Sequence, residues 1–398
     1  MEIGSVYEID PVKAAKHVLG PHKEVRMAGV LKYGKKNMVY TASGREAIEL
    51  ALYSLEREES SVCKKCLMPA YMCDTVFIPF VKMGWELIFY HVGKDMRADR
   101  QELDELIKKH QPGMLFIHAY YGVDTWKELR PVFAQYQKEG LLLMEDVTQS
   151  YYMRVDSGQE EGTGFGADYI VGSLRKWYAV PNGGFVAADH MLYPEVMVSE
   201  SSFWKRRLDM QTKKWNYLDG MQNRKGFDSL EKQHWVEYEL PRLLKEKETY
   251  LAENRQLENE LDHYEEITGL SALSHNMLLN VNEKACEKRR SENYRLLHEG
   301  LKNRKSLVPV FTECVKTAAP LYMPVYMKDR DALQSFLRER DIYVPVLWPV
   351  GKENAECLNE EEQYIFSHLA AIPMDQRYGS EEMKRIIDVI EEYERLKK

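Results

Sequence analysis

Three polar residues of this sequence stand where strands of an α/β sheet would end, and their types suit covalent chemistry at a carbonyl group. Asp146 closes the apolar run LLLMED, and Lys176 comes three residues after the run ADYIVGS, which ends at Ser173. His118 lies near the end of a third run, MLFIHAY. In open α/β sheets, ligands bind outside the carboxyl ends of the strands. We therefore expect an acid, an amine and a hydroxyl to share one rim of the sheet.

A predicted helix start adds a binding site for an anion to this rim. The segment Ser43-Gly44-Arg45 opens SGREAIELALYSLE, in which apolar residues recur at helical spacing. Ser43 is a residue type that caps helices. The free backbone N–H groups of a helix start bind phosphate groups. The sequence thus predicts a phosphate-binding turn beside the amine and the acid.

These residue types together fit pyridoxal phosphate. This cofactor forms a Schiff base with a lysine, for which Lys176 is the candidate. A buried carboxylate, here Asp146, would keep the ring nitrogen protonated, and Gly44, Arg45 and Ser173 would bind the phosphate. Burial would lower the pKa of the Lys176 amine because it penalises the charged form. A neutral amine attacks carbonyl groups and moves protons.

Three other motifs have weaker interpretations. Cys63 and Cys66 form a CxxC pair without a second ligand pair, whereas zinc needs four ligands, so we expect no metal site. A glycine-rich turn that binds a dinucleotide follows a strand and opens a helix. The glycine run 162–166 instead precedes a strand, so it does not indicate dinucleotide binding. The basic run at 203–215 is either an arm that meets an anionic substrate or a partner subunit, or a solvated segment anchored by two tryptophans.

The elements that must position these residues alternate between strands and helices. The predicted strands are 63–69, 85–92, 113–122, 141–146, 167–173 and 183–189, and the predicted helices are 43–56, 70–84, 100–110 and 126–140. Such alternation predicts an α/β fold in which a mostly parallel sheet is covered by helices on both faces.

The C-terminal part predicts a second, smaller α+β unit. Residues 230–268 predict one long helix leading out of the large domain. Beyond it, the sequence predicts strands at 321–327 and 342–349 and helices at 329–340 and 381–398. The expected division is an N-terminal segment 1–40, a large domain 41–268 and a small domain 269–398.

Composition excludes several classes of partner. The 398-residue chain has 55 Lys and Arg against 63 Asp and Glu, so its net charge of −8 argues against a nucleic-acid partner. Its apolar runs fall short of the ~20 residues that span a bilayer. The first residues lack the apolar stretch of a signal peptide, and six cysteines do not make a disulfide framework. We expect a cytoplasmic protein with no membrane partner.

An ordered set of segments resembles the DegT/StrS-type sugar aminotransferases, which have the aspartate aminotransferase fold. The segments are SGREAIELAL, LMPAYMCDTV, FIHAYYG, EDVTQSYY, GTGFGADYIVGSLRKW followed by NGG, and IPMDQRY, in order from about residue 41 to residue 378. The resemblance implies pyridoxal phosphate held by Lys176, which also serves as acid and base, and paired through its ring nitrogen with Asp146. It implies that Gln149 contacts the phenolic oxygen of the cofactor. It also implies a homodimer in which the partner chain completes each site.

The sequence departs from this family at several positions. Arg45 stands where the family has a small hydroxyl residue, and Ser173 precedes the lysine by three residues instead of five. Cys73 stands where the family has an aromatic residue that stacks on the cofactor ring, and Tyr71 is the nearby aromatic. The Asn-containing element that this family carries after the lysine is not found, and Asn216 and Asn223 are the candidates to replace it. These two asparagines and His118 are the residues that we expect to contact the substrate.

The function expected from the residues and the resemblance is a pyridoxal-phosphate aminotransferase. It would transfer an amino group, from glutamate, to a keto sugar linked to a nucleotide. The departures leave two alternatives open. One is a different pyridoxal-phosphate reaction on a carbonyl compound that is not a sugar, and the other is a protein of the same fold kept for binding or regulation.

Overall fold

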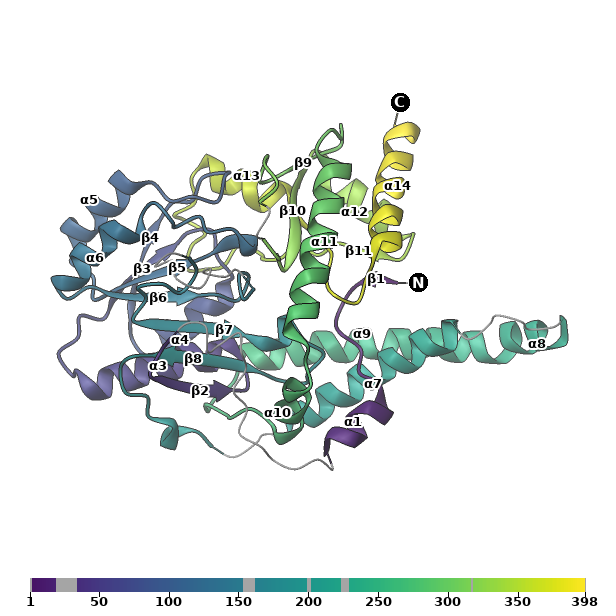
Figure 1. Ribbon diagram of the computed structural model, residues 1–398, viewed down its shortest axis with the longest axis horizontal. Coiled ribbons are helices and arrows are strands. Elements are labelled where there is room, and N and C mark those ends of the chain that lie inside the picture. The colour runs from purple at the N-terminus through teal and green to yellow at the C-terminus, as the bar shows by residue number, and fades with distance from the viewer. Residues whose placement is uncertain are drawn as a thin grey trace.

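A seven-stranded sheet forms the centre of the molecule (Figure 1). The computed structural model describes residues 2–18, 34–152, 162–198, 202–222, 229–315 and 318–397. In spatial order the strands are β2 (Asn37–Thr41), β8 (Gly184–Ala188), β7 (Tyr169–Ser173), β6 (Leu142–Asp146), β5 (Met114–His118), β3 (Lys65–Pro69) and β4 (Glu86–Tyr90). Within this sheet only β8 runs opposite to the other strands, and the pairs among β3 to β7 are all parallel, so the predicted mostly parallel sheet is confirmed.

Helices cover both faces of this sheet, as the sequence predicts. On one face, α3 (Gly44–Glu58) and α4 (Phe77–Lys82) pack on alternate strand residues such as Met114 and Phe116. On the other face, α5 (Arg100–His110) and α6 (Arg130–Lys138) pack on the residues between them, such as Leu115 and Ile117. Because successive side chains of a strand point to opposite faces, a strand buried on both sides is apolar throughout.

The predicted helix at 70–84 is mostly wrong. Residues 70–73 are not helical, and only a short 3₁₀ turn, η1 (Asp74–Val76), precedes the six-residue α4. Pro79 lies near the start of α4, where its missing N–H costs no helical hydrogen bond. The shortened helix leaves Met72 and Cys73 in a loop, and Thr75 in the turn η1, at the rim of the sheet.

A smaller unit follows at the C-terminal end. Its helices are α10 (Ala272–Leu279), α11 (Glu283–Leu301), α12 (Arg330–Arg338), α13 (Glu360–His368) and α14 (Ser380–Leu396), and its strands are β9 (Leu307–Pro309), β10 (Tyr322–Met327), β11 (Ile342–Tyr343) and β12 (Leu369–Pro373). The predicted strand at 342–349 is only the two-residue β11. Pro345 and Pro349 have no N–H to donate to a sheet, and the irregular chain between them carries Trp348.

Two long helices form an arm that projects from the body of the molecule (Figure 1). The basic run at 203–215 lies within α7 (Phe203–Gln222), which packs along α9 (Leu240–Asp262). The single helix predicted for 230–268 is instead α8 (Ser229–His234), a π-helical turn η5 (Trp235–Glu239) and α9. Pro241 follows that turn, and its ring removes the N–H that would continue the α-helical pattern. Among the described residues, none of the helices combines the length and apolar character needed to cross a membrane.

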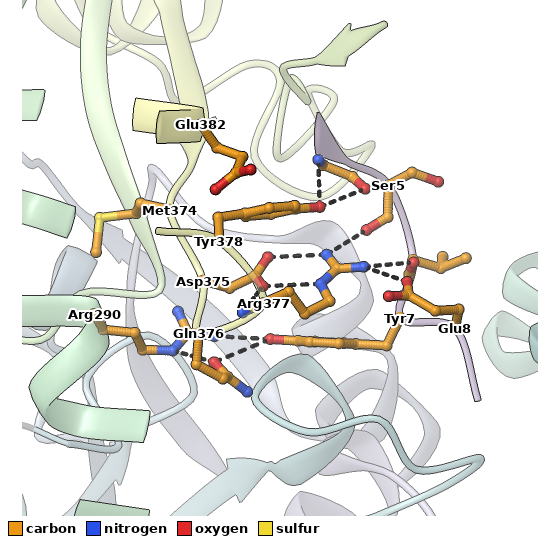
Figure 2. A network of polar contacts seen from close by, with 12 residues as sticks. Ser5, Tyr7, Glu8, Arg290, Met374, Asp375, Gln376, Arg377, Tyr378 and Glu382 are labelled. Atoms are coloured by element: carbon orange, nitrogen blue, oxygen red, sulfur yellow. Dashed lines mark hydrogen bonds and ion pairs between the residues drawn. The ribbon is translucent and has the colours of Figure 1, made fainter. Parts of the chain in front are cut away.

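The first residues of the chain join the arm to the C-terminal unit. The short strand β1 (Ile3–Gly4) pairs in parallel with β11, and α1 (Pro11–Val18) follows it. Figure 2 shows Arg377 between this segment and the chain after β12, where its guanidinium binds Asp375 and Glu8, both at 2.8 Å. The buried Lys214 of α7 lies 3.4 Å from Glu2 and 3.5 Å from Glu8. The buried Lys214 and the largely covered Arg377 therefore hold the N-terminal segment in place.

Candidate active site

The strands of the sheet bring the predicted site residues to one rim. His118, Asp146 and Ser173 are the last residues of β5, β6 and β7, and His118 pairs in register with Asp146. Because β8 runs in the opposite direction, its first residue, Gly184, lies at the same rim and pairs with both Thr41 and Ser173. A cavity opens here and is lined by Ser43, Gly44, Arg45, Ile48, Met72, Cys73, Thr75, Val76, His118, Asp146, Thr148, Gln149, Ser173, Arg175, Lys176 and Trp348.

Lys176 is the amine of this cavity. It ends the 3₁₀ turn η3 (Leu174–Lys176), which follows β7 directly and fixes the position of its backbone. Burial lowers the pKa of Lys176, and the nearby Arg175 and Arg45 lower it further, while Cys73 and Asp146 oppose them. The neutral, nucleophilic form of the amine is therefore favoured relative to an exposed lysine.

Asp146 is the acid of the cavity, and the structure gives it a partner. Its Oδ2 lies 3.1 Å from His118 Nδ1, and its Oδ1 accepts a hydrogen bond from the Thr148 backbone N–H at 2.8 Å. Burial alone would raise the pKa of Asp146, but His118 and Thr148 outweigh it, so the pKa lies below its ordinary value. Asp146 is thus an ionised carboxylate in the interior, suited to pair with a cation.

His118 also lines the cavity, at the end of β5. Its Nδ1 is engaged with Asp146, and its ring lies 4.9 Å from that of Tyr120 in an edge-on contact. Its Nε2 is buried and has no hydrogen-bond partner among the described residues. The imidazole thus supports the carboxylate directly, through a contact that only the register of β5 and β6 reveals.

Gln149 lines the same cavity. Its Oε1 accepts a hydrogen bond from the Tyr121 backbone N–H at 3.1 Å. Tyr121 has a positive φ of 52°, which turns this N–H toward the glutamine. With the oxygen engaged, the amide NH₂ is the group that Gln149 can offer to an acceptor in the cavity.

The start of α3 forms the anion-binding end of the cavity. Ser43 caps the helix, because its hydroxyl accepts a hydrogen bond from the Glu46 N–H at 3.3 Å. A Cβ at Gly184 would lie 2.2 Å from the Ser43 carbonyl oxygen, so only glycine lets β8 approach this turn so closely. Ser173 places its hydroxyl at the same end, and a Cβ at Gly44 would lie 3.4 Å from its Cβ.

Three arginines of separate elements adjoin this end of the cavity. Arg45 Nη1 lies 2.8 Å from Asp262 Oδ1 without hydrogen-bond geometry, and it has no hydrogen-bond partner among the described residues. Arg175 donates to both oxygens of Glu258, at 2.9 and 3.1 Å, and Arg207 of α7 donates to the same carboxylate. Burial and the charge of Arg175 lower the pKa of Arg207 to about 10. Three cations and two acids concentrate positive charge where an anion would bind.

Two of the predicted cofactor-binding side chains differ in their relation to the cavity. Cys73 lines it, with its Sγ 3.0 Å from Thr75 Oγ1. Tyr71 is not among the lining residues. It is buried, and its hydroxyl lies 3.3 Å from that of Tyr121. The aromatic side chain that does line the cavity is Trp348, whose ring lies 4.9 Å from that of Tyr71.

Thr148, Arg175 and Trp348 line the cavity but were not among the predicted residues. Thr148 and Arg175 each lie close in sequence to a predicted residue, Asp146 and Lys176 respectively, so their sequence position was a usable signal. Trp348 lies far away in sequence, in a segment predicted to be a strand. Asn216 is exposed on α7 and does not line the cavity. Asn223 lies outside the described residues.

The residues present fit pyridoxal phosphate. The low-pKa amine of Lys176 and the ionised Asp146 line one cavity with the helix start at Ser43 and the Ser173 hydroxyl. The buried Arg45 Nη1, which pairs with Asp262 without hydrogen-bond geometry, would gain a hydrogen-bond acceptor from a phosphate. The aldehyde, ring nitrogen and phosphate of the cofactor thus each have a matching protein group, and the amide of Gln149 matches its phenolic oxygen.

Comparisons with known proteins identify the fold. The chain matches no protein-family model and no curated protein. Among solved structures, it is similar to the sugar aminotransferase CalS13 from Micromonospora echinospora (15% identity, 98% of this chain and 99% of that chain, TM-score 0.61). It is also similar to PseC of Helicobacter pylori, an aminotransferase involved in the biosynthesis of pseudoaminic acid (15% identity, 98% of this chain and 99% of that chain, TM-score 0.63). A third similar structure is a DegT DnrJ EryC1 StrS aminotransferase from Brucella abortus (15% identity, 96% of this chain and 94% of that chain, TM-score 0.60). The chain therefore has the fold of these aminotransferases over nearly its whole length, as the resemblance implied.

Proposed function

We propose that this protein is an aminotransferase that uses pyridoxal phosphate. The observation that carries the proposal is the pairing, in one cavity, of a lysine whose pKa is lowered by burial with a carboxylate kept ionised by His118 and Thr148. The cofactor, when bound, supplies an electron-withdrawing ring that stabilises negative charge on the carbon next to an amino group.

Each residue of the site has a distinct role in this proposal. Lys176 would hold the cofactor covalently through its aldehyde and would serve as the acid and base that moves a proton. Asp146 would keep the ring nitrogen protonated, and the amide of Gln149 would donate to the phenolic oxygen. Ser43, Gly44, Arg45 and Ser173 would bind the phosphate.

The substrates that we propose are glutamate as amino donor and a keto sugar, linked to a nucleotide, as acceptor. Support comes from the solved structures of the same fold, because CalS13 is a sugar aminotransferase and DesI was solved in the presence of its TDP-sugar product. We also propose that the chain works as a homodimer, as the resemblance implies.

A spectroscopic titration tests the reaction. Purified protein supplied with pyridoxal phosphate should absorb visible light, and glutamate should bleach that absorbance. Adding keto sugars one at a time should restore it when an acceptor fits. A protein that binds the cofactor but does not respond to any amino donor would contradict an aminotransferase function.

A further inference from the structure

Trp348 is the one large aromatic side chain that lines the cavity within the part of the chain that the structure describes. It belongs to the C-terminal unit, whereas the other residues that line the cavity belong to the large sheet and its connections. Its side chain is 5% exposed. The indole ring lies 5.8 Å from the ring of His118, in an edge-on contact at 73°. Trp348 thus stands next to the histidine that supports Asp146.

Two contacts fix the loop that carries this tryptophan. Asn354 is fully buried, and its Nδ2 donates a hydrogen bond of 2.7 Å to the Ala70 carbonyl oxygen. A Cβ added at Gly351 would lie 2.7 Å from the Cβ of Asp74, so the loop packs tightly against that residue. Ala70 and Asp74 flank the segment that contributes Met72 and Cys73 to the cavity. The loop is therefore held against the cavity wall on both sides of that segment.

We propose that Trp348 is the aromatic surface against which the pyridine ring of the cofactor packs. This inference rests on the proposed function. A flat ring with a cation at its nitrogen gains both dispersion and electrostatic attraction from an indole face. Asp146 marks where the ring nitrogen would lie, and Trp348 contacts the histidine bound to that carboxylate. Asn354 and Gly351 are positioning residues that hold the loop of Trp348 against the cavity.

Binding of pyridoxamine phosphate, measured by calorimetry on the cofactor-free protein, tests this inference without any catalysis. This form of the cofactor has the same ring and phosphate but no aldehyde, so its affinity reports ring packing apart from the covalent bond to Lys176. Trp348→Ala should weaken its binding about tenfold. Trp348→Leu, which keeps apolar bulk without an aromatic face, should lose nearly as much, and Trp348→Phe should recover most of the loss.

Inorganic phosphate and two matched variants provide the controls. Phosphate has no ring, so its affinity should be the same in Trp348→Ala and in the wild type. Trp215→Ala, which removes a half-buried indole from the arm, should leave both affinities unchanged. Asn354→Ala should weaken binding of pyridoxamine phosphate in the same direction as Trp348→Ala. Asn280→Ala removes a similar donor to a backbone carbonyl at the end of α10, away from the cavity, and should not.

The outcomes separate this inference from the proposed function. Wild-type affinity for pyridoxamine phosphate in Trp348→Ala and Trp348→Leu, with thermal unfolding showing both variants folded, would overturn the role of Trp348 and leave the aminotransferase proposal standing. An equal loss of affinity for inorganic phosphate would also overturn it, because the tryptophan would then act through the general shape of the site. A wild-type protein that binds neither form of the cofactor would contradict the proposed function itself.

Discussion

At the scale of single residues, the site depends on how burial acts on two charges of opposite sign. Burial penalises both the Lys176 ammonium and the Asp146 carboxylate, but only the carboxylate is compensated by hydrogen bonds, from His118 and the Thr148 backbone. The pKa values of both groups therefore fall. The amine is favoured as a nucleophile while the acid remains an anion, as this chemistry requires.

Replacing His118 should expose its effect on Asp146. In His118→Phe, burial is no longer opposed by the imidazole, so the pKa of Asp146 should rise. The acidic limb of the kcat/KM profile should move to higher pH, and the plateau should fall by roughly 10- to 100-fold, as for the loss of a hydrogen bond to a charged group. A profile with an unchanged acidic limb would contradict the role assigned to His118.

Replacing Lys176 should stabilise the cofactor-free protein. The folded protein holds the lysine at a pKa below its ordinary value of 10.5, so the unfolded chain binds more protons between the two values. Wild-type stability should therefore rise with pH in that window. Lys176→Met should remove this rise and add on the order of 1 kcal/mol at neutral pH, measured by urea unfolding. Lys288→Met, at an exposed position on α11, should change neither property, and a destabilised Lys176→Met would refute the assigned burial.

The sequence predicted those site residues that end strands or cap a helix. Asp146, Ser173, Lys176 and Ser43 could be placed because parallel strands bring their carboxyl ends to one rim. The bond between His118 and Asp146 depends on strand register, which no local pattern encodes. Trp348 reaches the cavity only because the C-terminal unit packs on the large sheet, a tertiary contact that periodicity cannot predict.

At the scale of elements, the sequence predicted the types well and several boundaries poorly. Strands β3 to β8 of the large sheet and the helices α3, α5 and α6 follow from their apolar periods, whereas the edge strand β2 was not predicted. Other errors occur near prolines. Pro241 places a π-helical turn before α9, and Pro345 and Pro349 leave an irregular loop where a strand was predicted. That loop carries Trp348, so a segment that was predicted to be a strand but is irregular supplies a residue of the cavity.

The junction in Figure 2 links the N-terminal segment to the site lysine through buried polar contacts. Arg290 donates to the Gln376 side chain at 2.7 Å and to the Tyr7 hydroxyl at 2.8 Å. Gln376 in turn donates to the backbone carbonyl of Trp177 at 2.6 Å, next to Lys176. The packing of the N-terminal segment and of the C-terminal unit therefore supports the position of the lysine.

Removing Arg377 should strongly destabilise this junction. Arg377→Met would leave the buried Asp375 and the half-buried Glu8 without their main partner, at a cost of about 3 kcal/mol in urea unfolding. Folding lowers the pKa values of Glu8 and Asp375 below the ordinary values of these acids. The two carboxylates therefore stabilise the folded protein at a pH above those ordinary pKa values, and this stabilisation is lost as the pH falls through the lowered ones. The deficit of the variant should shrink at acidic pH. Arg338→Met, exposed on α12, is the matched control, and an equally small effect of both changes would contradict the assigned network.

Over the whole molecule, the chain combines a fold shared with sugar aminotransferases and a projecting arm that contacts a residue lining the cavity. Glu258, on α9 of the arm, binds Arg175 next to the lysine and Arg207 of α7. The arm is thus tied to the anion-binding end of the site through one carboxylate. The helices of the arm follow Lys176 in the sequence, in the region where the resemblance to DegT/StrS-type enzymes implies an Asn-containing element.

We expect the protein to be a homodimer. Light scattering should therefore give twice the chain mass of 46.7 kDa, whether or not cofactor is added. A mixture of two inactive variants, one at Lys176 and one in a residue contributed across the interface, should regain activity if the partner chain completes each site. A protein that stays monomeric at micromolar concentration while it is active would contradict this expectation.

Borohydride reduction followed by peptide mass spectrometry tests whether Lys176 holds the cofactor covalently. The wild-type protein, incubated with pyridoxal phosphate and reduced, should carry the phosphopyridoxyl group on the peptide that contains Lys176. Lys176→Ala should carry none, while Lys94→Ala, a change at an exposed lysine, should be labelled like the wild type. Stoichiometric labelling at another lysine, or none at Lys176 at saturating cofactor, would contradict the account.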